Sequence, residues 1–401
     1  MGITVISEHG ELFGGEARIP VLWICGPPGV GKSTIAWEVY SRLAQDGVSC
    51  AYVDIDQLGI CYPGRSDEGH EVKAPNLGAV VENFRNAGAR IVIVSGVIDA
   101  PAVAIYVEAA PAATLKLIRL RLSPEALRAR ILARSEDAVQ LADQVIEYAE
   151  ALDRGDFPAP CLETDGAAIT DAVDQVIRRA ETLLRDAPAP ADLAPCPART
   201  KAASASRAPM LWLCGPAAVG KSTIGWRIFD EVRNSGTKAA FVDLQQIGFL
   251  YPAPPDDPGN HRLKASNLAS MWSTFRADCA GCMVVVGTID SADETQRYRE
   301  ALPTVDLTVC RLSAGRSTLV DRIAARAAGS GPRLAGDGLL GRTPNVLAMA
   351  ADRAIADNES MSRAGMGDLC VDTDGRTVED LARAIRGLTG DWPGEGVSAS
   401  R

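Results

Sequence analysis

The sequence lacks the apolar segments that carry proteins into or across membranes. No run of about 18 uninterrupted apolar residues occurs in the 401-residue chain, so no membrane-spanning helix is expected. The first twenty residues carry acidic side chains and contain no basic stretch followed by an apolar core, so no secretory signal is expected. These absences predict a cytoplasmic protein whose ten cysteines are reduced.

The chain also lacks an excess of positive charge and a convincing metal-binding pattern. Its 41 Lys and Arg residues are outnumbered by 51 Asp and Glu, which makes nucleic acid an improbable main partner because phosphate backbones require concentrated positive charge. Cys279 and Cys282 form a lone CxxC with no second ligand pair and no neighbouring histidine. We therefore expect no zinc or redox site there.

What the sequence does contain is one domain-sized pattern, present twice. GPPGVGKSTIAW (26–37) returns as GPAAVGKSTIGW (215–226), and HEVKAPNL (70–77) returns as HRLKASNL (261–268). A late TDG also recurs, but in the second copy it follows a Gly-rich stretch, residues 329–343, which we interpret as an insertion. The predicted organisation is a first domain (1–186), an Ala/Pro-rich linker (187–208), a second domain (209–390) and a tail (391–401).

Each copy alternates short apolar runs with helical patterns. In the first copy the expected strands are 20–25, 50–55, 90–95, 114–120 and 160–164, and one expected helix spans about 73–87. Strands that are apolar throughout and are each followed by a helix are typical of a parallel sheet covered on both faces. The predicted fold class is therefore α/β, with two tandem domains of this kind.

Both copies carry a phosphate-binding loop. GPPGVGKS and GPAAVGKS fit G-x-x-x-x-G-K-[ST], and each follows an expected strand and precedes an expected helix. Such a loop directs backbone N–H groups at phosphate oxygens, the lysine reaches the β- and γ-phosphates, and the serine offers a hydroxyl to Mg²⁺. The predicted cofactors are ATP and Mg²⁺. The predicted nucleotide-binding residues are Gly26, Gly29, Gly31, Lys32, Ser33 and Thr34 in the first copy, and Gly215, Gly220, Lys221, Ser222 and Thr223 in the second.

Two carboxylates end the second expected strand of the first copy. Because side chains alternate along a strand, Asp54 and Asp56 are expected on the same side, where one can hold Mg²⁺ and the other can meet an acceptor hydroxyl. The alternative is that they only mark a solvated turn. In the second copy Asp243 is kept but Gln245 replaces the second carboxylate.

A further repeated set is His70, Lys73 and Asn76. Lys73 and Asn76 are three residues apart on the expected helix and so share a face that is suited to an anionic or hydroxylated acceptor. Alternatively, His70 caps the helix and Lys73 is solvated. The second copy repeats the set as His261, Lys264 and Asn267.

Arg130 and Arg134 are one helical turn apart after the fourth expected strand, and the second copy repeats this spacing with Arg322 and Arg326. Arginines on a short helix can close over a transferring phosphoryl group, although most such arginines are simply solvated. No acidic residue ends the strand 90–95, unlike in motor-type and GTPase-type NTPases.

Together, the P-loop, the D-x-D, the arginine helix and the late TDG resemble the P-loop small-molecule kinases. This group includes adenylylsulfate kinase, shikimate kinase, gluconate kinase and the zeta-toxin or chloramphenicol phosphotransferase group. The resemblance implies nucleoside-monophosphate-kinase-like domains and ATP-dependent transfer of a phosphoryl group to a hydroxyl of a small-molecule acceptor. It also implies a metal-side role for Asp54, an acceptor-side role for Asp56, and an adenine-side position for Thr164, Asp165 and Gly166.

The chain departs from adenylylsulfate kinases, which carry D-G-D-N where this sequence has D-I-D-Q. The loss of a carboxylate at Gln245 predicts that the second copy binds nucleotide but barely turns it over, because an amide accepts no proton at neutral pH. The alternative function is an ATP-binding regulatory protein with two P-loop domains and no small-molecule acceptor.

Overall fold

The computed structural model describes residues 18–64, 69–133, 138–155, 157–186, 207–289, 291–331 and 334–394. Most of the predicted linker (187–206), the end of the predicted tail (395–401) and Arg134 lie outside these residues. The chain divides into two units. Unit 1 comprises Met1–Asp56, Lys73–Ala198 and Phe249–Ala253, and unit 2 comprises Gln57–Val72, Arg199–Gly248 and Pro254–Arg401.

Unit 1 is built on a six-stranded sheet with the order β6-β5-β1-β4-β2-β9. Five of its strands are parallel neighbours: β1 (Ile19–Cys25), β2 (Cys50–Asp54), β4 (Ile91–Ser95), β5 (Ala113–Arg121) and β6 (Cys161–Glu163). They match the five strands expected from the apolar runs. Every residue of β1 and β4 is buried, as expected for central strands covered on both faces.

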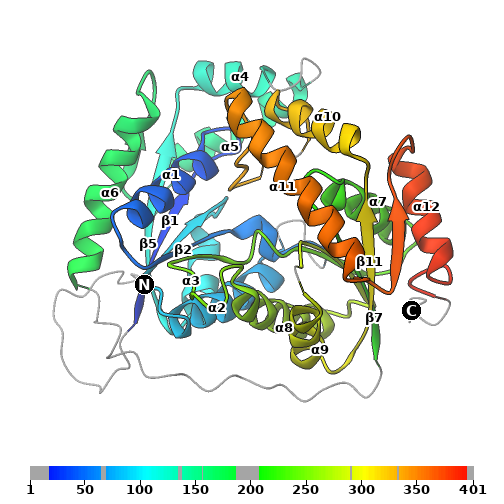
Figure 1. The fold of residues 1–401 in the computed structure, drawn as a ribbon. Helices are drawn as coiled ribbons and strands as arrows, with labels where there is room; N and C mark the ends of the chain where they lie inside the picture. The colour runs from blue at the N-terminus through cyan, green and yellow to red at the C-terminus, as the bar shows by residue number, and fades with distance from the viewer. Residues whose placement is uncertain are drawn as a thin grey trace. The chain divides into compact units, whose positions relative to one another are not determined.

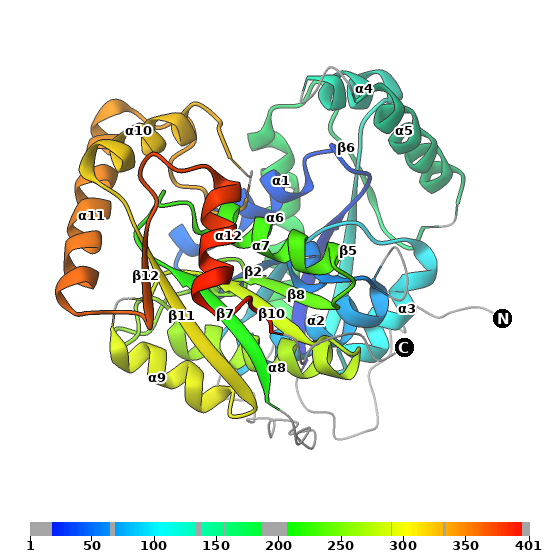
Figure 2. The same cartoon turned by 90° about the vertical axis from the view of Figure 1, so that its right-hand side faces the viewer.

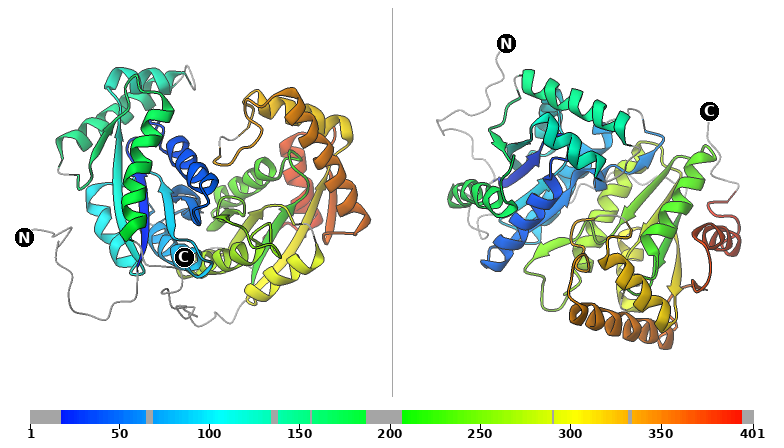
Figure 3. Two further views of the ribbon diagram at one scale, coloured as in Figure 1. Left: turned by 60° about the vertical axis from the view of Figure 1, so that its left-hand side comes forward. Right: turned by 90° about the horizontal axis from the view of Figure 1, so that it is seen from above.

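The helices of unit 1 cover both faces of this sheet (Figure 1). They are α1 (Lys32–Gln45), α2 (His70–Asn86), α3 (Ala100–Ala109), α4 (Pro124–Leu132), α5 (Val139–Arg154) and α6 (Ile169–Asp186). Figure 3 shows α6 running beside α1, and these two helices are in contact. The predicted α/β fold is confirmed.

Unit 2 has a second six-stranded sheet with the order β12-β11-β7-β10-β8-β3. Its parallel strands are β7 (Ala208–Cys214), β8 (Ala239–Asp243), β10 (Cys282–Val286), β11 (Val305–Ser313) and β12 (Leu369–Asp372), seen side by side in Figure 2. Its helices are α7 (Lys221–Asn234), α8 (His261–Ala277), α9 (Ala292–Ala301), α10 (Arg316–Ala327), α11 (Pro344–Arg363) and α12 (Val378–Leu388). The parallel strands therefore follow the same order in the two sheets.

The sixth strand of each sheet was not expected from the sequence, because it comes from the other repeat. In unit 1, β9 (Phe249–Tyr251) pairs antiparallel with β2. In unit 2, β3 (Cys61–Tyr62) pairs antiparallel with β8. We call β3 and β9 the exchanged strands. Each covers an edge that would otherwise present unpaired backbone groups.

The exchanged strand of unit 1 also completes an aromatic cluster. The ring of Phe249 lies 4.8 Å from that of Trp37 and 5.8 Å from that of Tyr52, and Phe249 is only 7% exposed. Unit 1 therefore draws part of its core from residues about 200 positions further along the chain than the strand that they cover.

Among the described helices, none is long and apolar enough to cross a membrane.

Candidate active site

The two phosphate-binding loops connect the first strand of each repeat to its first helix. At Gly26 the backbone has φ +137°, and a Cβ there would lie 2.6 Å from the carbonyl oxygen of Leu120, so only glycine fits. Gly215 repeats this, with a Cβ position 2.5 Å from the carbonyl oxygen of Leu312. Gly31 and Gly220 both have φ +105° directly before the helix begins. The two loops therefore share one local geometry.

The loop lysines lie against the loops' own carbonyl groups. Lys32 Nζ donates to the carbonyl oxygen of Pro27 across 2.9 Å. Lys221 Nζ donates to those of Gly215 and Pro216 across 2.9 and 2.7 Å, and burial lowers the pKa of Lys221 to about 8. Both ammonium groups are thus held within the loop that would cradle phosphates.

Asp54 lies at the carboxyl end of β2, directly beside the phosphate loop. Its Oδ2 accepts a hydrogen bond from Ser33 Oγ across 3.0 Å. Its pKa is raised, first because the carboxyl is buried and second because of the nearby charge of Asp56. In unit 2, Ser222 Oγ donates to Asp243 Oδ2 across the same 3.0 Å. Both loops therefore have a carboxylate at their serine.

Asp56 reaches this site by a route that the sequence reasoning did not foresee. The strand ends at Asp54, and Ile55–Leu58 forms a short 3₁₀ turn, so the alternation of side chains along a strand does not place Asp56. Instead, its backbone N–H donates to Asp54 Oδ1 across 3.0 Å. Gln245 N makes the same bond to Asp243 Oδ1, so the two units differ here in charge rather than in backbone geometry.

On the acceptor side, the structure brings Lys73 to Asp56. Lys73 Nζ lies 2.9 Å from Asp56 Oδ1, and the lysine side chain is 19% exposed whereas the aspartate side chain is 59% exposed. Lys73 is therefore ion-paired rather than simply solvated, and the carboxylate remains open to solvent.

The other two residues of the predicted acceptor set are less accessible. His70 is the first residue of α2 and is partly buried, and Asn76 is fully buried. In unit 2 the equivalent Asn267 donates to the carbonyl oxygen of Ile247 across 2.7 Å, and His261 Nδ1 lies 3.1 Å from Tyr298 Oη. Burial and these contacts of the second copy favour a packing role for the histidine and asparagine positions.

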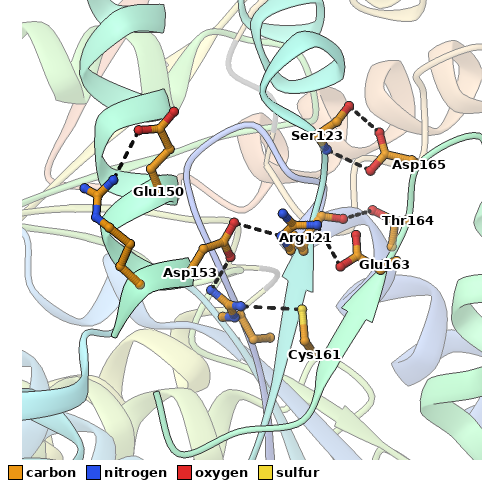
Figure 4. A network of polar contacts seen from close by, with 10 residues as sticks. Arg121, Ser123, Glu150, Asp153, Cys161, Glu163, Thr164 and Asp165 are labelled. Atoms are coloured by element: carbon orange, nitrogen blue, oxygen red, sulfur yellow. Dashed lines mark hydrogen bonds and ion pairs between the residues drawn. The ribbon is translucent and has the colours of Figure 1, made fainter. Parts of the chain in front are cut away.

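The arginine helix of unit 1, α4, is bonded both to the phosphate loop and to the TDG turn. Arg130 Nη1 donates to the carbonyl oxygen of Val30 in the phosphate loop across 3.1 Å. At the start of α4, Ser123 donates from both its backbone N–H and its hydroxyl to Asp165, each across 2.7 Å (Figure 4). These bonds, the hydroxyl bond first, lower the pKa of Asp165.

The TDG turn is therefore bound to the helix that carries Arg130. Thr164 Oγ1 donates to the carbonyl oxygen of Arg121 across 3.0 Å (Figure 4). Gly166 has φ +62° at the turn. The Thr164 hydroxyl and the Asp165 carboxylate are thus both used in bonds within unit 1.

In unit 2 the predicted insertion borders the second phosphate loop. A cavity of about 460 Å³ is lined by Lys221, Ser222, Gln245 and Arg326 together with insertion residues that include Ala335 and Asp337. We call residues 334–343 the insertion loop. Gln246 Nε2 donates to the carbonyl oxygen of Ala335 across 3.1 Å, and Arg326 Nε lies 3.0 Å from Asp337 Oδ2. The insertion loop is thus tied to the cavity wall at two points.

The family model of the AAA domain matches residues 22–152. That range begins in β1, contains the phosphate loop of unit 1 and ends in α5. A search of the curated proteins found no match.

Solved structures with a similar fold include three of interest. The tunicamycin resistance protein of Deinococcus radiodurans is 16% identical, with 46% of this chain and 96% of that chain covered at a TM-score of 0.32. A gluconokinase from Sinorhizobium meliloti is 16% identical (42% and 94% covered, TM-score 0.29), and an APS kinase of Mycobacterium tuberculosis is 19% identical (46% and 98% covered, TM-score 0.29). Likenesses at these TM-scores carry no argument about the family or the activity of this chain.

Proposed function

We propose that the protein is an ATP-dependent kinase that transfers the γ-phosphoryl group to a hydroxyl of a small-molecule acceptor, with its active site in unit 1. The observation that carries this proposal is the pair of carboxylates beside the phosphate loop. Asp54 accepts from Ser33 across 3.0 Å, while Asp56, fixed by its bond to Asp54, keeps a largely exposed side chain. Such a pair supports one metal-side and one acceptor-side role.

The residues at the phosphate loop fit a Mg²⁺ ion bound together with nucleotide. Mg²⁺ prefers oxygen ligands and is usually held by one or two carboxylates, substrate phosphates and water. Ser33 Oγ and Asp54 supply oxygens at one place. Among the described residues, no group of three or more His, Cys, Asp or Glu side chains could hold a metal. When bound, Mg²⁺ would neutralise charge on the phosphate oxygens.

In the proposed reaction, the acceptor oxygen forms a bond to the γ-phosphorus as the bond from that phosphorus to the bridging oxygen of ADP breaks. Asp56 orients the acceptor hydroxyl and accepts its proton. Lys32 binds the β- and γ-phosphates, and Arg130, together with Arg134, stabilises negative charge on the group in transfer. Lys73 holds Asp56 in place through their 2.9 Å ion pair on the acceptor side. The partly buried His70 and the buried Asn76, predicted from the sequence to bind the acceptor, would support this side by packing.

For unit 2 we propose a nucleotide-binding domain that barely turns nucleotide over. It keeps Lys221, Ser222 and Asp243, which supports binding, but has Gln245 where unit 1 has Asp56. The cavity bordered by the insertion loop supports a retained nucleotide, which also favours the second candidate function, an ATP-binding regulator.

The test of the proposed function is acceptor-dependent ATP consumption. The full chain is incubated with MgATP and panels of sugars, nucleosides, sulfonucleotides and hydroxylated antibiotics, and ADP release is followed. The kinase predicts ADP formation that depends on one acceptor class and equals the amount of phosphorylated product. ATP consumption that is unaffected by every acceptor would favour the regulator instead.

A further inference from the structure

A chain of hydroxyl groups leads from the core of unit 1 to Asp54. Tyr52 Oη lies 2.9 Å from Ser95 Oγ, and Ser95 Oγ donates to Asp54 Oδ2 across 2.7 Å. Tyr52 and Ser95 are both fully buried. Ser95 ends β4 at the position paired with Asp54 of β2, where motor-type NTPases carry an aspartate.

The direction of these bonds follows from the number of protons available. An ionised carboxylate can only accept, so the single hydroxyl proton of Ser95 is used on Asp54. The bond between Tyr52 and Ser95 must then be donated by the tyrosine. Tyr52 therefore holds the hydroxyl group of Ser95 in place. Ser95 in turn holds Oδ2 of Asp54, the same oxygen that accepts from Ser33.

The second repeat provides a natural comparison in the same backbone. Asp243 pairs with Val286 as Asp54 pairs with Ser95, so valine stands in the place of the serine. Two residues before the aspartate, Phe241 stands in the place of Tyr52. Unit 2 thus lacks both hydroxyls, as well as the second carboxylate, while its bond from Ser222 to Asp243 is unchanged at 3.0 Å.

The joint presence of these groups has a physical reason. In unit 1, Asp54 is partly buried and lies two residues from Asp56, so repulsion between the two carboxylates opposes ionisation of Asp54. A second hydroxyl donor to Asp54 offsets this repulsion and restricts the direction of the carboxylate. Asp243 has an uncharged Gln245 in that place, so it has no comparable need.

We propose that Tyr52 and Ser95 are positioning residues that hold the Asp54 carboxylate for Mg²⁺ at the active site of unit 1. The inference rests on the proposed function for the metal-side role of Asp54. Mutation of a residue that orients a metal ligand typically lowers metal affinity by about 10- to 100-fold. The effect therefore belongs in the Mg²⁺ dependence of nucleotide binding, and not in binding without metal.

The experiment measures binding of a non-hydrolysable ATP analogue to the full chain over a range of Mg²⁺ concentrations. All variants carry Lys221→Ala so that unit 1 dominates the signal. Ser95→Ala should raise the half-saturating Mg²⁺ concentration about tenfold, and Tyr52→Phe should raise it by a smaller factor in the same direction. Affinity in the presence of a chelator should stay within about twofold of the parent, because no phosphate-binding group is altered.

The matched control is Tyr40→Phe, which removes a hydroxyl from the same aromatic cluster. It should leave the Mg²⁺ dependence unchanged. The proposal is overturned if Ser95→Ala lowers only the melting temperature, or if Tyr40→Phe shifts the Mg²⁺ requirement as much as Tyr52→Phe. This readout needs no acceptor, so a failure of the kinase assignment would appear in the acceptor panels and not here.

Discussion

The ammonium group of Lys73 lies 2.9 Å from Oδ1 of Asp56, and these two residues are the points at which the chain leaves unit 1 and returns to it. In unit 2 the equivalent lysine, Lys264, is only 8% exposed and packs against Gly248. The same lysine position is thus paired with Asp56 in one repeat and is buried beside Gly248 in the other.

The first prediction concerns Asp56. Asp56→Gln should retain ATP affinity within a few-fold and lower the rate of phosphoryl transfer by about 10²- to 10⁴-fold, because the amide still accepts hydrogen bonds but takes up no proton. Steady-state rates and calorimetric ATP titrations of the full chain measure the two quantities. Gln245→Asp is the matched control and should leave the rate of unit 1 unchanged. A normal rate for Asp56→Gln would remove the argument for a general base at this position.

The second prediction compares the two loop lysines. Lys32→Ala should abolish turnover, because unit 1 alone combines the phosphate loop with two carboxylates, and Lys221→Ala should leave a substantial fraction of the activity. Steady-state rates of both variants are measured under saturating MgATP. If Lys221→Ala proved the more damaging change, unit 2 would be the active half.

Much of the fold and part of the site were predictable because their signals are local. The fully buried strands β1 and β4 are continuous apolar runs, and the phosphate loops are fixed motifs next to them. The same repeats that identified the loops also placed Asp54 and Asp243 beside the loop serines.

What escaped prediction depends on contacts between distant residues. The exchanged strands have two and three residues, too few for a periodic pattern, and their partners lie in the other repeat. The bond from Ser95 to Asp54 joins residues 41 positions apart on two strands, so no local pattern predicts it. The change from Tyr52 to Phe241 between the repeats was a visible signal that the two sites differ in their hydroxyl groups. Asp56 lies in a 3₁₀ turn after the strand has ended. The alternation of side chains along a strand was therefore the wrong reason for expecting Asp56 beside Asp54.

The third prediction tests the exchanged strand β9. Phe249→Ala should lower the free energy of unfolding of unit 1 by about 3 kcal/mol, because it removes a buried ring that packs on Trp37 and Tyr52. Differential scanning calorimetry and tryptophan fluorescence, to which Trp37 contributes, report the change. Tyr251→Ala in the same strand is the control, since that side chain is 38% exposed and should matter little. Equal stability of Phe249→Ala and the parent would mean that β9 contributes nothing to unit 1.

By the same argument, a fragment of residues 1–190 would lack Phe249 and should be less stable than unit 1 in the full chain.

The last prediction concerns the insertion loop of unit 2. Asp337 pairs with Arg326 across 3.0 Å at the cavity that holds the second phosphate loop, and the aspartate side chain is only 13% exposed. Replacing a charge-assisted bond by the neutral bond that an asparagine can keep costs about 1 kcal/mol, which corresponds to roughly a fivefold change in an equilibrium or rate constant. In a chain that carries Lys32→Ala to silence unit 1, Asp337→Asn should therefore speed nucleotide dissociation from unit 2 about fivefold, because one of the two ties of the loop to the cavity wall is weakened. Stopped-flow displacement of a fluorescent ATP analogue measures this rate.

Asp352→Asn is the matched control, since the pair of Asp352 with Arg316 is exposed on both sides (72% and 70%) and neither residue lines the cavity. If the two variants released nucleotide at the same rate, the insertion loop would have no part in retaining it. If neither bound the analogue, the proposed nucleotide-binding role of unit 2 would be wrong.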